Sequence, residues 1–315
     1  MTEVPAGVMR TDEARFAHLT DFPFTPRYVS VPDARFGALR MAAIDEGPRG
    51  APVALLLHGE PTWSYLYRRI IPRVTAAGFR AVAPDFIGFG RSDKPAGRGD
   101  YSYQAFVGWL RAFVEALDLT RVTLVCQDWG GPIGLSVLSQ APERYAAVLA
   151  ANTLLPNCEP PPRGIDGWPG EIIENWVAMA AAAADLPVSG IIAAVCCRPP
   201  APEALRAYDA PFPDASFKAA VLAFPGLIPI RESMPGITEN RRVWEVLESF
   251  TRPFVTAFSD GDPTTAPWAE VFRRRVPGAR GQPHPVIANA GHFLQEEQGE
   301  ALADVLAGLL RRCAA

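Results

Sequence analysis

The chain contains 315 residues, 49% of them hydrophobic and 20% charged, which is enough apolar material for one large α/β domain with or without an insertion. Lysine and arginine number 30 against 34 aspartates and glutamates, and the net charge of −4 without a basic tract argues against a nucleic acid partner. The N-terminus lacks the apolar core of a signal peptide, and the five cysteines show no metal-ligand spacing, so we expect a cytoplasmic protein with reduced thiols.

Strand-like and helix-like segments alternate over most of the chain. This pattern is typical of a largely parallel sheet that is covered by helices on both faces. In chain order, the first half predicts strands at 27–31, 39–45 and 52–57, a helix at 65–77, a strand at 79–84, a helix at 103–117, and strands at 122–127 and 146–151. The first helix is expected to end at Gly78.

The alternation stops between residue 156 and about residue 232, where the chain is rich in proline and alanine. Helical patches are expected there at 171–184, 189–195 and 216–224. Alternation then resumes with strands at 253–258 and 285–287 and helices at 268–275 and 301–312. We therefore predict a core domain of residues 1–155 and 233–315 and a helical cap, or lid, of residues 156–232. Such an insertion would roof the carboxyl edge of the sheet, where ligands bind in open α/β folds.

The most apolar stretch of the chain, residues 177–197, is alanine-rich and is interrupted by Asp185, Pro187 and Gly190. This composition fits a pair of buried helices better than a membrane span, so we expect no membrane partner. No heptad or apolar stripe indicates a subunit interface, and a monomer is the default expectation.

An aspartate at the corner between a strand and a helix gives the first indication of chemistry. Residues 122–125 read as a short buried strand and Gly130 opens a helix, so Asp128 stands where a hydrolase holds its nucleophile. Cys126 and Gly130 supply the small neighbours that this corner requires. A carboxylate placed there attacks carbon and leaves an ester on the enzyme, which favours alkyl halides or epoxides over esters as substrates.

The segment His58-Gly-Glu-Pro-Thr-Trp63 directly follows the strand that ends at residue 57. In folds with this type of corner, the loop at this position supplies one backbone N–H of an oxyanion hole and the residue after the nucleophile supplies the other. These donors would be the N–H groups of Glu60 and Trp129. The alternative is that His-Gly only makes a tight turn.

His292 is the candidate general base. It follows the last predicted strand, and the order nucleophile, acid, histidine is that of α/β-hydrolases. The acid that orients His292 should follow the first strand after the insertion, where Asp260 and Asp262 both stand. We favour Asp262, which precedes a proline, although both residues could be ordinary turn aspartates.

Three tryptophans are candidates for contact with a leaving group. Trp129 follows the nucleophile, and an indole N–H is a donor without acceptor capacity, which suits a departing halide ion. In the predicted lid, Trp176 lies in a helical stretch and could reach Asp128, with Trp168 as the alternative. The other tryptophans are interpreted as packing residues.

Together these residues resemble a haloalkane dehalogenase of the α/β-hydrolase superfamily, and the match runs through nearly the whole chain. The motifs that carry the resemblance are His58-Gly-Glu-Pro-Thr-Trp-Ser-Tyr-Leu-Tyr-Arg68, Pro84-Asp-Phe-Ile-Gly-Phe-Gly-Arg-Ser-Asp-Lys-Pro95, Gln127-Asp-Trp-Gly-Gly131, Tyr208-Asp-Ala-Pro-Phe-Pro-Asp214 and Gly291-His-Phe293. The resemblance implies an α/β-hydrolase fold with a mostly parallel eight-stranded sheet and a helical cap.

The resemblance also implies site chemistry. Family members hold the halide with the tryptophan after the nucleophile, here Trp129, and with either an asparagine of the His-Gly-Asn-Pro loop or a lid tryptophan. This chain has Glu60 in that loop, so the lid-tryptophan branch is implied, with Trp176 matching better than Trp168. An Asp-Pro pair commonly marks the family's acid, which supports Asp262. The implied partners are a small haloalkane, water and a halide ion, with no metal or organic cofactor.

Several other functions compete with this interpretation. An epoxide hydrolase would share the aspartate and the histidine–acid pair but would use a pair of lid tyrosines, and the predicted lid contains only Tyr208. A fluoroacetate-type dehalogenase would need arginines near the nucleophile, and an esterase would need a serine at position 128. The protein could also be a ligand-binding protein without catalytic activity. The presence of a candidate nucleophile, base and acid disfavours this alternative.

Overall fold

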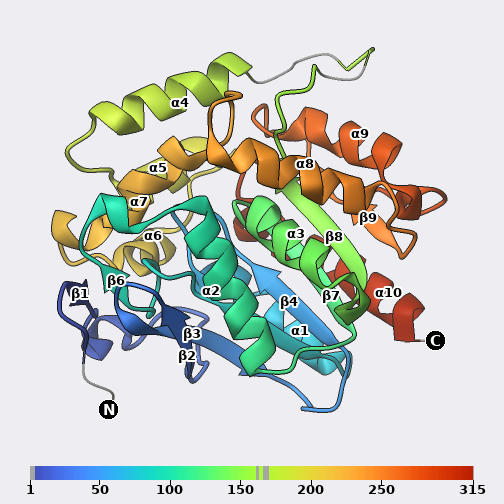
Figure 1. The fold of residues 1–315 in the computed structure, drawn as a ribbon. Coiled ribbons are helices and arrows are strands. Elements are labelled where there is room, and N and C mark those ends of the chain that lie inside the picture. The colour runs from blue at the N-terminus through green and yellow to red at the C-terminus, as the bar shows by residue number, and fades with distance from the viewer. Residues whose placement is uncertain (1–3, 161–162, 166–169, 315) are drawn as a thin grey trace.

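A seven-stranded sheet forms the centre of the computed structural model, which describes residues 4–160, 163–165 and 170–314 (Figure 1). The strands lie in the order β2-β3-β5-β4-β7-β8-β9. The hairpin strands β2 and β3 are antiparallel to each other and to β5, and the remaining neighbours are parallel. The bounds are β2 Arg27–Asp33, β3 Gly37–Glu46, β4 Val53–Leu57, β5 Arg80–Pro84, β7 Val122–Asp128, β8 Tyr145–Thr153 and β9 Phe254–Thr256.

The eighth strand of the predicted sheet is a short separate pairing. β10 (Phe258–Ser259) continues the chain from β9 after a one-residue interruption at Ala257, and it pairs in parallel with β11 (Val286–Ile287). A second pair, β1 (Val8–Met9) with β6 (Lys94–Pro95), lies near the N-terminus and was not predicted. The mostly parallel α/β sheet is therefore confirmed, with seven strands in its continuous part.

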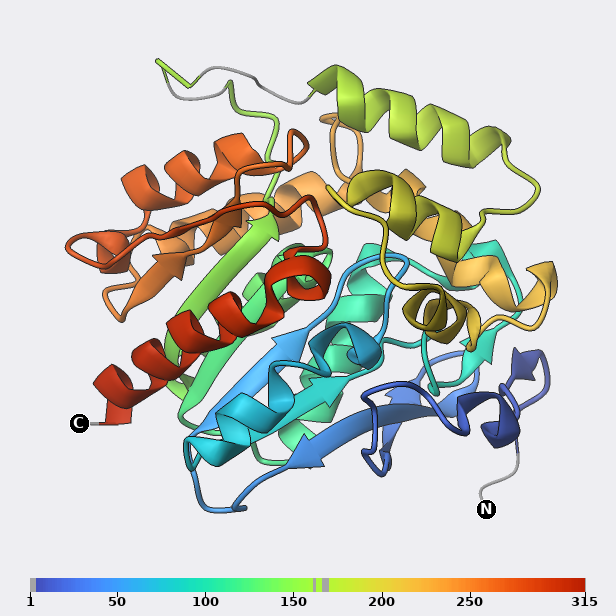
Figure 2. The same cartoon turned by 180° about the vertical axis from the view of Figure 1, so that it is seen from behind.

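Helices cover both faces of the sheet. Figure 1 shows α2 (Tyr103–Ala116), α3 (Gly130–Gln140) and α8 (Pro235–Leu247) on the near face, and Figure 2 shows α1 (Ile71–Ala76) and α10 (Leu294–Ala314) together on the other. α9 (Ala266–Arg275) packs beside β8, β9 and β10.

The predicted helix at 65–77 differs from the structure. The chain forms a 3-10 turn at Ser64–Tyr67 and begins α1 anew at Ile71, with Pro72 in the first turn of α1, where a missing N–H costs the helix no hydrogen bond. Gly78, the second residue after α1, has a φ of +86°, as expected for the end of a helix.

Helices and the loops that join them make up the described part of the inserted segment, and no strand occurs among those residues. It contains α4 (Gly170–Ala182), α5 (Val188–Val195), α6 (Pro202–Asp209) and α7 (Ala219–Ala223), which lie over the carboxyl ends of the central strands (Figures 1 and 2). α6 was not predicted, because its apolar face is short. Within the described ranges no helix is long and apolar enough to cross a membrane.

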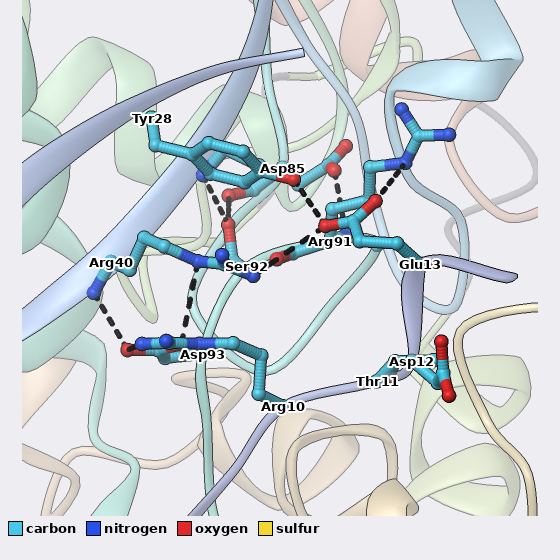
Figure 3. Close-up of polar contacts among 12 residues, drawn as sticks. Arg10, Thr11, Asp12, Glu13, Tyr28, Arg40, Asp85, Arg91, Ser92 and Asp93 are labelled. Carbon is cyan, nitrogen blue, oxygen red and sulfur yellow. Dashed lines mark hydrogen bonds and ion pairs between the residues drawn. The ribbon is translucent and has the colours of Figure 1, made fainter. Parts of the chain in front are cut away.

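The N-terminal segment contacts both the core and the lid, and Figure 3 shows the cluster of charged side chains that joins it to the core. The Arg10 guanidinium donates to both carboxylate oxygens of Asp93, at 2.7 and 2.9 Å. Glu13 accepts a hydrogen bond from the Tyr28 hydroxyl. On the lid side, Thr11 Oγ1 donates to the Pro211 carbonyl at 2.7 Å. Through the N-terminal segment, the lid residues that follow α6 are thus held in a fixed position relative to the edge of the sheet.

Candidate active site

Asp128 lies at the strand-to-helix corner that the sequence predicts. It ends β7 with a φ of +49°, in the left-handed region that non-glycine residues rarely adopt. Glycine is required opposite it, because a Cβ on Gly59 would lie 2.3 Å from Asp128 Cβ. A Cβ on Gly130 would likewise lie 2.4 Å from the Leu57 carbonyl oxygen. Close packing of β4, β7 and α3 therefore holds the Asp128 side chain above the sheet edge.

The loop after β4 donates a backbone hydrogen bond to the Asp128 carboxylate. The Glu60 N–H donates to Asp128 Oδ1 at 2.9 Å, as the oxyanion-hole prediction requires. The buried His58 stabilises this loop. Its Nδ1 lies 2.9 Å from the Gly59 carbonyl, and its Nε2 accepts a hydrogen bond from the Phe86 N–H at 3.0 Å. Burial lowers the pKa of His58, which fits a neutral structural histidine.

His292 lies between two carboxylates. Its Nε2 is 3.5 Å from Asp128 Oδ2, and its Nδ1 is 2.9 Å from Asp262 Oδ2. The Thr264 N–H donates to Asp262 Oδ1 at 2.9 Å, and the Thr265 hydroxyl donates to Oδ2. Burial opposes ionisation of Asp262, but His292 and these donors outweigh it and lower the pKa of the Asp262 carboxyl. The structure thus brings together all three residues of the predicted triad.

Asp260, the other candidate acid, is exposed to solvent. Its carboxylate accepts the backbone N–H groups of Asn289 and Ala290, at 3.1 and 3.4 Å, and so caps the turn after β11. The two aspartates therefore have separate contacts, one with the imidazole and one with the backbone of a turn.

The charge state of His292 depends on the charge of Asp128. Burial by itself would lower the pKa of His292, but Asp262 and Asp128 stabilise the charged imidazole and raise its pKa to about 10. The imidazole is therefore positively charged in the free protein at neutral pH. Any reaction that neutralises Asp128 removes part of this stabilisation, lowers the pKa of His292 and favours release of its proton.

Two further polar residues at the carboxyl ends of strands contact the His292 loop, and sequence reasoning missed both. The Gln127 amide lies 3.1 Å from His292 Nε2 and donates to the His292 carbonyl at 3.3 Å. Asn152 Nδ2 donates to the carbonyls of Gly291 and His292, at 2.9 and 3.0 Å. A polar residue that ends a buried apolar strand is the signal that could have identified each of them.

An apolar cavity of about 200 Å³ lies above these groups, between the sheet edge and the lid. Asp128, His292 and Trp129 are on its core side, and Trp176 is on its lid side. Its remaining lining residues are Glu60, Leu154, Ile172, Ile173, Ile191, Val195, Ile228, Thr264 and Phe293. The alternative lid residue Trp168 lies outside the described residues. A small apolar molecule could therefore reach the Asp128 carboxylate with indole rings beside it.

The Glu60 side chain also lines this cavity, a role that the sequence did not predict. Glu60 is 7% exposed, and among the described residues its Oε1 has no hydrogen-bond partner. Burial and the neighbouring Asp128 charge raise the pKa of Glu60 well above its usual value, against a smaller opposing effect of His292. The surroundings of Glu60 therefore favour the neutral form of its carboxyl group.

A second, larger cavity of about 440 Å³ lies beyond Pro156 and Pro229, beside Trp268. It contains Glu159 and Glu174 but neither the aspartate–histidine pair nor the corner after β7. Size alone therefore does not identify the reactive site, and the smaller cavity contains the reactive groups.

The chain is similar to known proteins over almost its whole length. A family model described as the alpha/beta hydrolase fold matches residues 52–182. A haloalkane dehalogenase of Psychrobacter cryohalolentis is 46% identical over 299 residues, which cover 95% of this chain and 96% of that protein. A haloalkane dehalogenase of Mycobacterium marinum is 42% identical over 297 residues, covering 94% and 97%. Among solved structures, the tetrameric haloalkane dehalogenase DpaA from Paraglaciecola agarilytica NO2 is 36% identical, with a TM-score of 0.82 over 94% of this chain and 96% of that one.

Proposed function

The chain belongs to the haloalkane dehalogenases, hydrolases that act on carbon–halide bonds, and we propose that Asp128, His292 and Asp262 carry out its reaction. The observation that carries this assignment is the contact of His292 with both aspartates, at 3.5 and 2.9 Å, on the core side of an apolar cavity. The substrate is a small haloalkane, and the products are an alcohol, a halide ion and a proton.

In the first step, an oxygen of the Asp128 carboxylate attacks the halogen-bearing carbon in line. The new carbon–oxygen bond makes an ester on Asp128, and the carbon–halogen bond breaks with its electron pair leaving on the halide. The apolar lining favours this step because a poorly hydrated carboxylate is a better nucleophile than a hydrated one. The Glu60 N–H holds the carboxylate in a fixed orientation.

In the second step, water attacks the carboxyl carbon of the ester. Esterification neutralises Asp128 and lowers the pKa of His292, so the imidazole releases its proton and becomes a base for this water. Asp262 keeps the ring oriented and stabilises the imidazolium that forms. The N–H groups of Glu60 and Trp129 stabilise the oxyanion. Collapse of this intermediate releases the alcohol and restores the Asp128 carboxylate.

Two indole N–H groups are proposed to stabilise the leaving halide, one from Trp129 and one from the lid. Trp129 follows the nucleophile and lines the cavity. Trp176 lines the same cavity from α4 and is the lid residue we favour, with Trp168 as the alternative.

Replacement of these tryptophans tests the proposal. We expect Trp129→Phe to lower the rate of halide release by roughly 10²–10³, by analogy with the loss of one oxyanion donor. A loss of similar size in either Trp176→Phe or Trp168→Phe identifies the lid donor. Rapid-mixing measurements of halide release report the rates. Trp109→Phe is the control, since the Trp109 indole donates to Asp33 and does not line the cavity. Full activity of Trp129→Phe would contradict the proposed role.

Replacement of each candidate acid by asparagine should have a different effect on turnover. Asp262→Asn removes the charge that orients His292 and raises its pKa, so we expect turnover to fall by roughly 10⁴, as for the orienting aspartate of other hydrolases. Asp260→Asn changes only a turn contact and should keep nearly full turnover. Steady-state halide release measures both variants. The reverse order of effects would assign the acid to Asp260.

An epoxide hydrolase would use the same nucleophile, and the lid distinguishes the two activities. Tyr208 is the single tyrosine of residues 156–232, and its hydroxyl donates to Glu296 Oε2 at 2.7 Å in a fully buried position. It is therefore not available to protonate an epoxide oxygen. We expect halide release from 1,2-dibromoethane or 1-bromobutane and no opening of styrene oxide. Opening of styrene oxide without halide release would favour the epoxide hydrolase, and no reaction at all would favour a ligand-binding protein.

We also propose a domain division, a location and an oligomeric state. We retain the division into a core of residues 1–155 and 233–315 and a cap of residues 156–232, because the helices α4 to α7 lie over the sheet edge. We propose a cytoplasmic location, which the free cysteines support. We propose a monomer as the starting assumption, although the relative from Paraglaciecola agarilytica is described as tetrameric.

A further inference from the structure

The loop that leaves the lid helix α5 lies directly against the loop that carries His292. The His292 N–H donates to the Val195 carbonyl at 2.9 Å. A Cβ on Gly291 would lie 2.2 Å from this carbonyl oxygen, and a Cβ on Gly261 would lie 2.5 Å from the Cys197 sulfur. The lid loop therefore packs closely against both the segment that carries the base and the segment that carries the acid. A glycine in each of these segments leaves room for it.

One carboxylate joins the two loops from below. Glu297, in the first turn of α10, accepts the Gly291 N–H at 2.7 Å and the Cys197 N–H at 2.9 Å, both on Oε2. Its Oε1 accepts the Arg198 N–H at 2.8 Å. In Figure 2 the chain that leaves α5 descends beside the start of the red helix α10. Hydrogen bonds to an ionised acceptor are roughly twice as strong as neutral ones, so this side chain is well suited to hold both loops.

We propose that Glu297 is a positioning residue that couples the closed lid to the orientation of His292. Glu297 does not line the cavity, and it acts through the Gly291 N–H, one residue before the base. The inference rests on the proposed role of His292 in the second step. His292 is correctly placed as a base only while the lid loop and the His292 loop both donate hydrogen bonds to the Glu297 carboxylate.

The proposal predicts an effect on one chemical step only. Asp128 is held by β7, α3 and the Glu60 N–H, none of which contacts Glu297, so formation of the ester should keep its rate. Hydrolysis of the ester depends on where the imidazole lies, and a displacement of about 1 Å can cost about 10² in rate. Loss of the Glu297 contacts should therefore slow hydrolysis by about 10-fold to 10² and leave the alkyl-enzyme to accumulate.

The test compares Glu297→Gln with Glu300→Gln in the full-length protein. Glutamine has the same length as glutamate but offers one acceptor oxygen to three N–H donors, whereas Glu300 is exposed on the same helix and makes no contact with either loop. Quench-flow with 1,2-dibromoethane gives the rate constants of halide release and of ester hydrolysis separately. His292→Gln is measured beside them as the reference for a missing base, and thermal melting reports the fraction folded.

The expected result is a normal burst of halide, slowed hydrolysis and accumulated alkyl-enzyme in Glu297→Gln, with native behaviour in Glu300→Gln. Unchanged hydrolysis in Glu297→Gln would overturn the coupling, and so would equal losses in both steps together with a lower melting temperature. If His292→Gln itself accumulates no ester, the proposed base is wrong and the coupling fails with it. Should Glu297→Gln not fold, Glu297→Asp keeps the charge, loses reach and should show the same selective slowing of hydrolysis.

Discussion

Asp128→Asn is expected to reduce halide release from haloalkanes to background. Loss of the nucleophile costs other hydrolases roughly 10⁶ in kcat, and a neutral amide oxygen cannot displace halide at a useful rate. Asparagine has nearly the shape of aspartate, so the Glu60 N–H, which donates to Oδ1, can keep its partner. The His292 pKa should fall, because one of the two carboxylates that raise it is lost. Halide release under saturating substrate measures the effect.

A matched control separates chemistry from folding. Asp304→Asn replaces an aspartate whose side chain is 73% exposed on α10, and it should leave halide release and melting temperature unchanged. Asp128→Asn should fold as the native chain does, because the side chain is 18% exposed and the corner is held by glycines on both sides. Halide release by a folded Asp128→Asn protein at a rate near that of the native chain would exclude Asp128 as the nucleophile.

His292→Gln is expected to stop the reaction halfway. Ester formation needs Asp128 and the halide donors, so the variant should release halide once, in an amount equal to the enzyme. Hydrolysis needs a base, and general-base catalysis contributes roughly 10²–10⁴ to rate, so turnover should fall by at least that factor. Glutamine is comparable in size to histidine but has no titratable group. The measurement is the amplitude and rate of the halide burst under excess substrate.

The replacement of His284 provides a control for the loss of a histidine. His284 contacts Thr256 and the Ala279 carbonyl and does not line the cavity. His284→Gln should therefore complete many turnovers, and its halide release should not stop after a first burst. Two outcomes for His292→Gln would contradict its role as base in the second step. One is continued turnover at the native rate, and the other is the loss of the halide burst in a folded protein.

The parts of this site that follow a local rule were predictable from the sequence. Asp128 ends a buried apolar strand and is flanked by small residues, and these features alone predict the corner with positive φ. His292 was predictable by elimination, since the chain has four histidines and one of them follows the last strand. Asp262 could be favoured over Asp260 only by its neighbouring proline, and the contact with His292 distinguishes the two aspartates in the structure.

The remaining features depend on contacts between distant segments. Gln127 reaches His292 across 165 positions of sequence, and Glu297 reaches the lid loop across 100. A local pattern can mark Gln127 as a polar residue near the end of a buried strand, but it does not identify the contact partner of either residue. Helices α6 and α8 were missed because charged residues are frequent in both segments, while packing on neighbouring elements stabilises them. The raised pKa of Glu60 likewise follows from burial beside Asp128, which only the fold creates.

A single-turnover reaction in H₂¹⁸O with enzyme in excess tests the covalent route most directly. If Asp128 forms the ester and water attacks its carboxyl carbon, the alcohol carries ordinary oxygen taken from the Asp128 carboxylate. The ¹⁸O then appears in the peptide that contains Asp128. Incorporation of ¹⁸O into the alcohol with an unlabelled Asp128 peptide would show that water displaces the halide directly and would contradict the account.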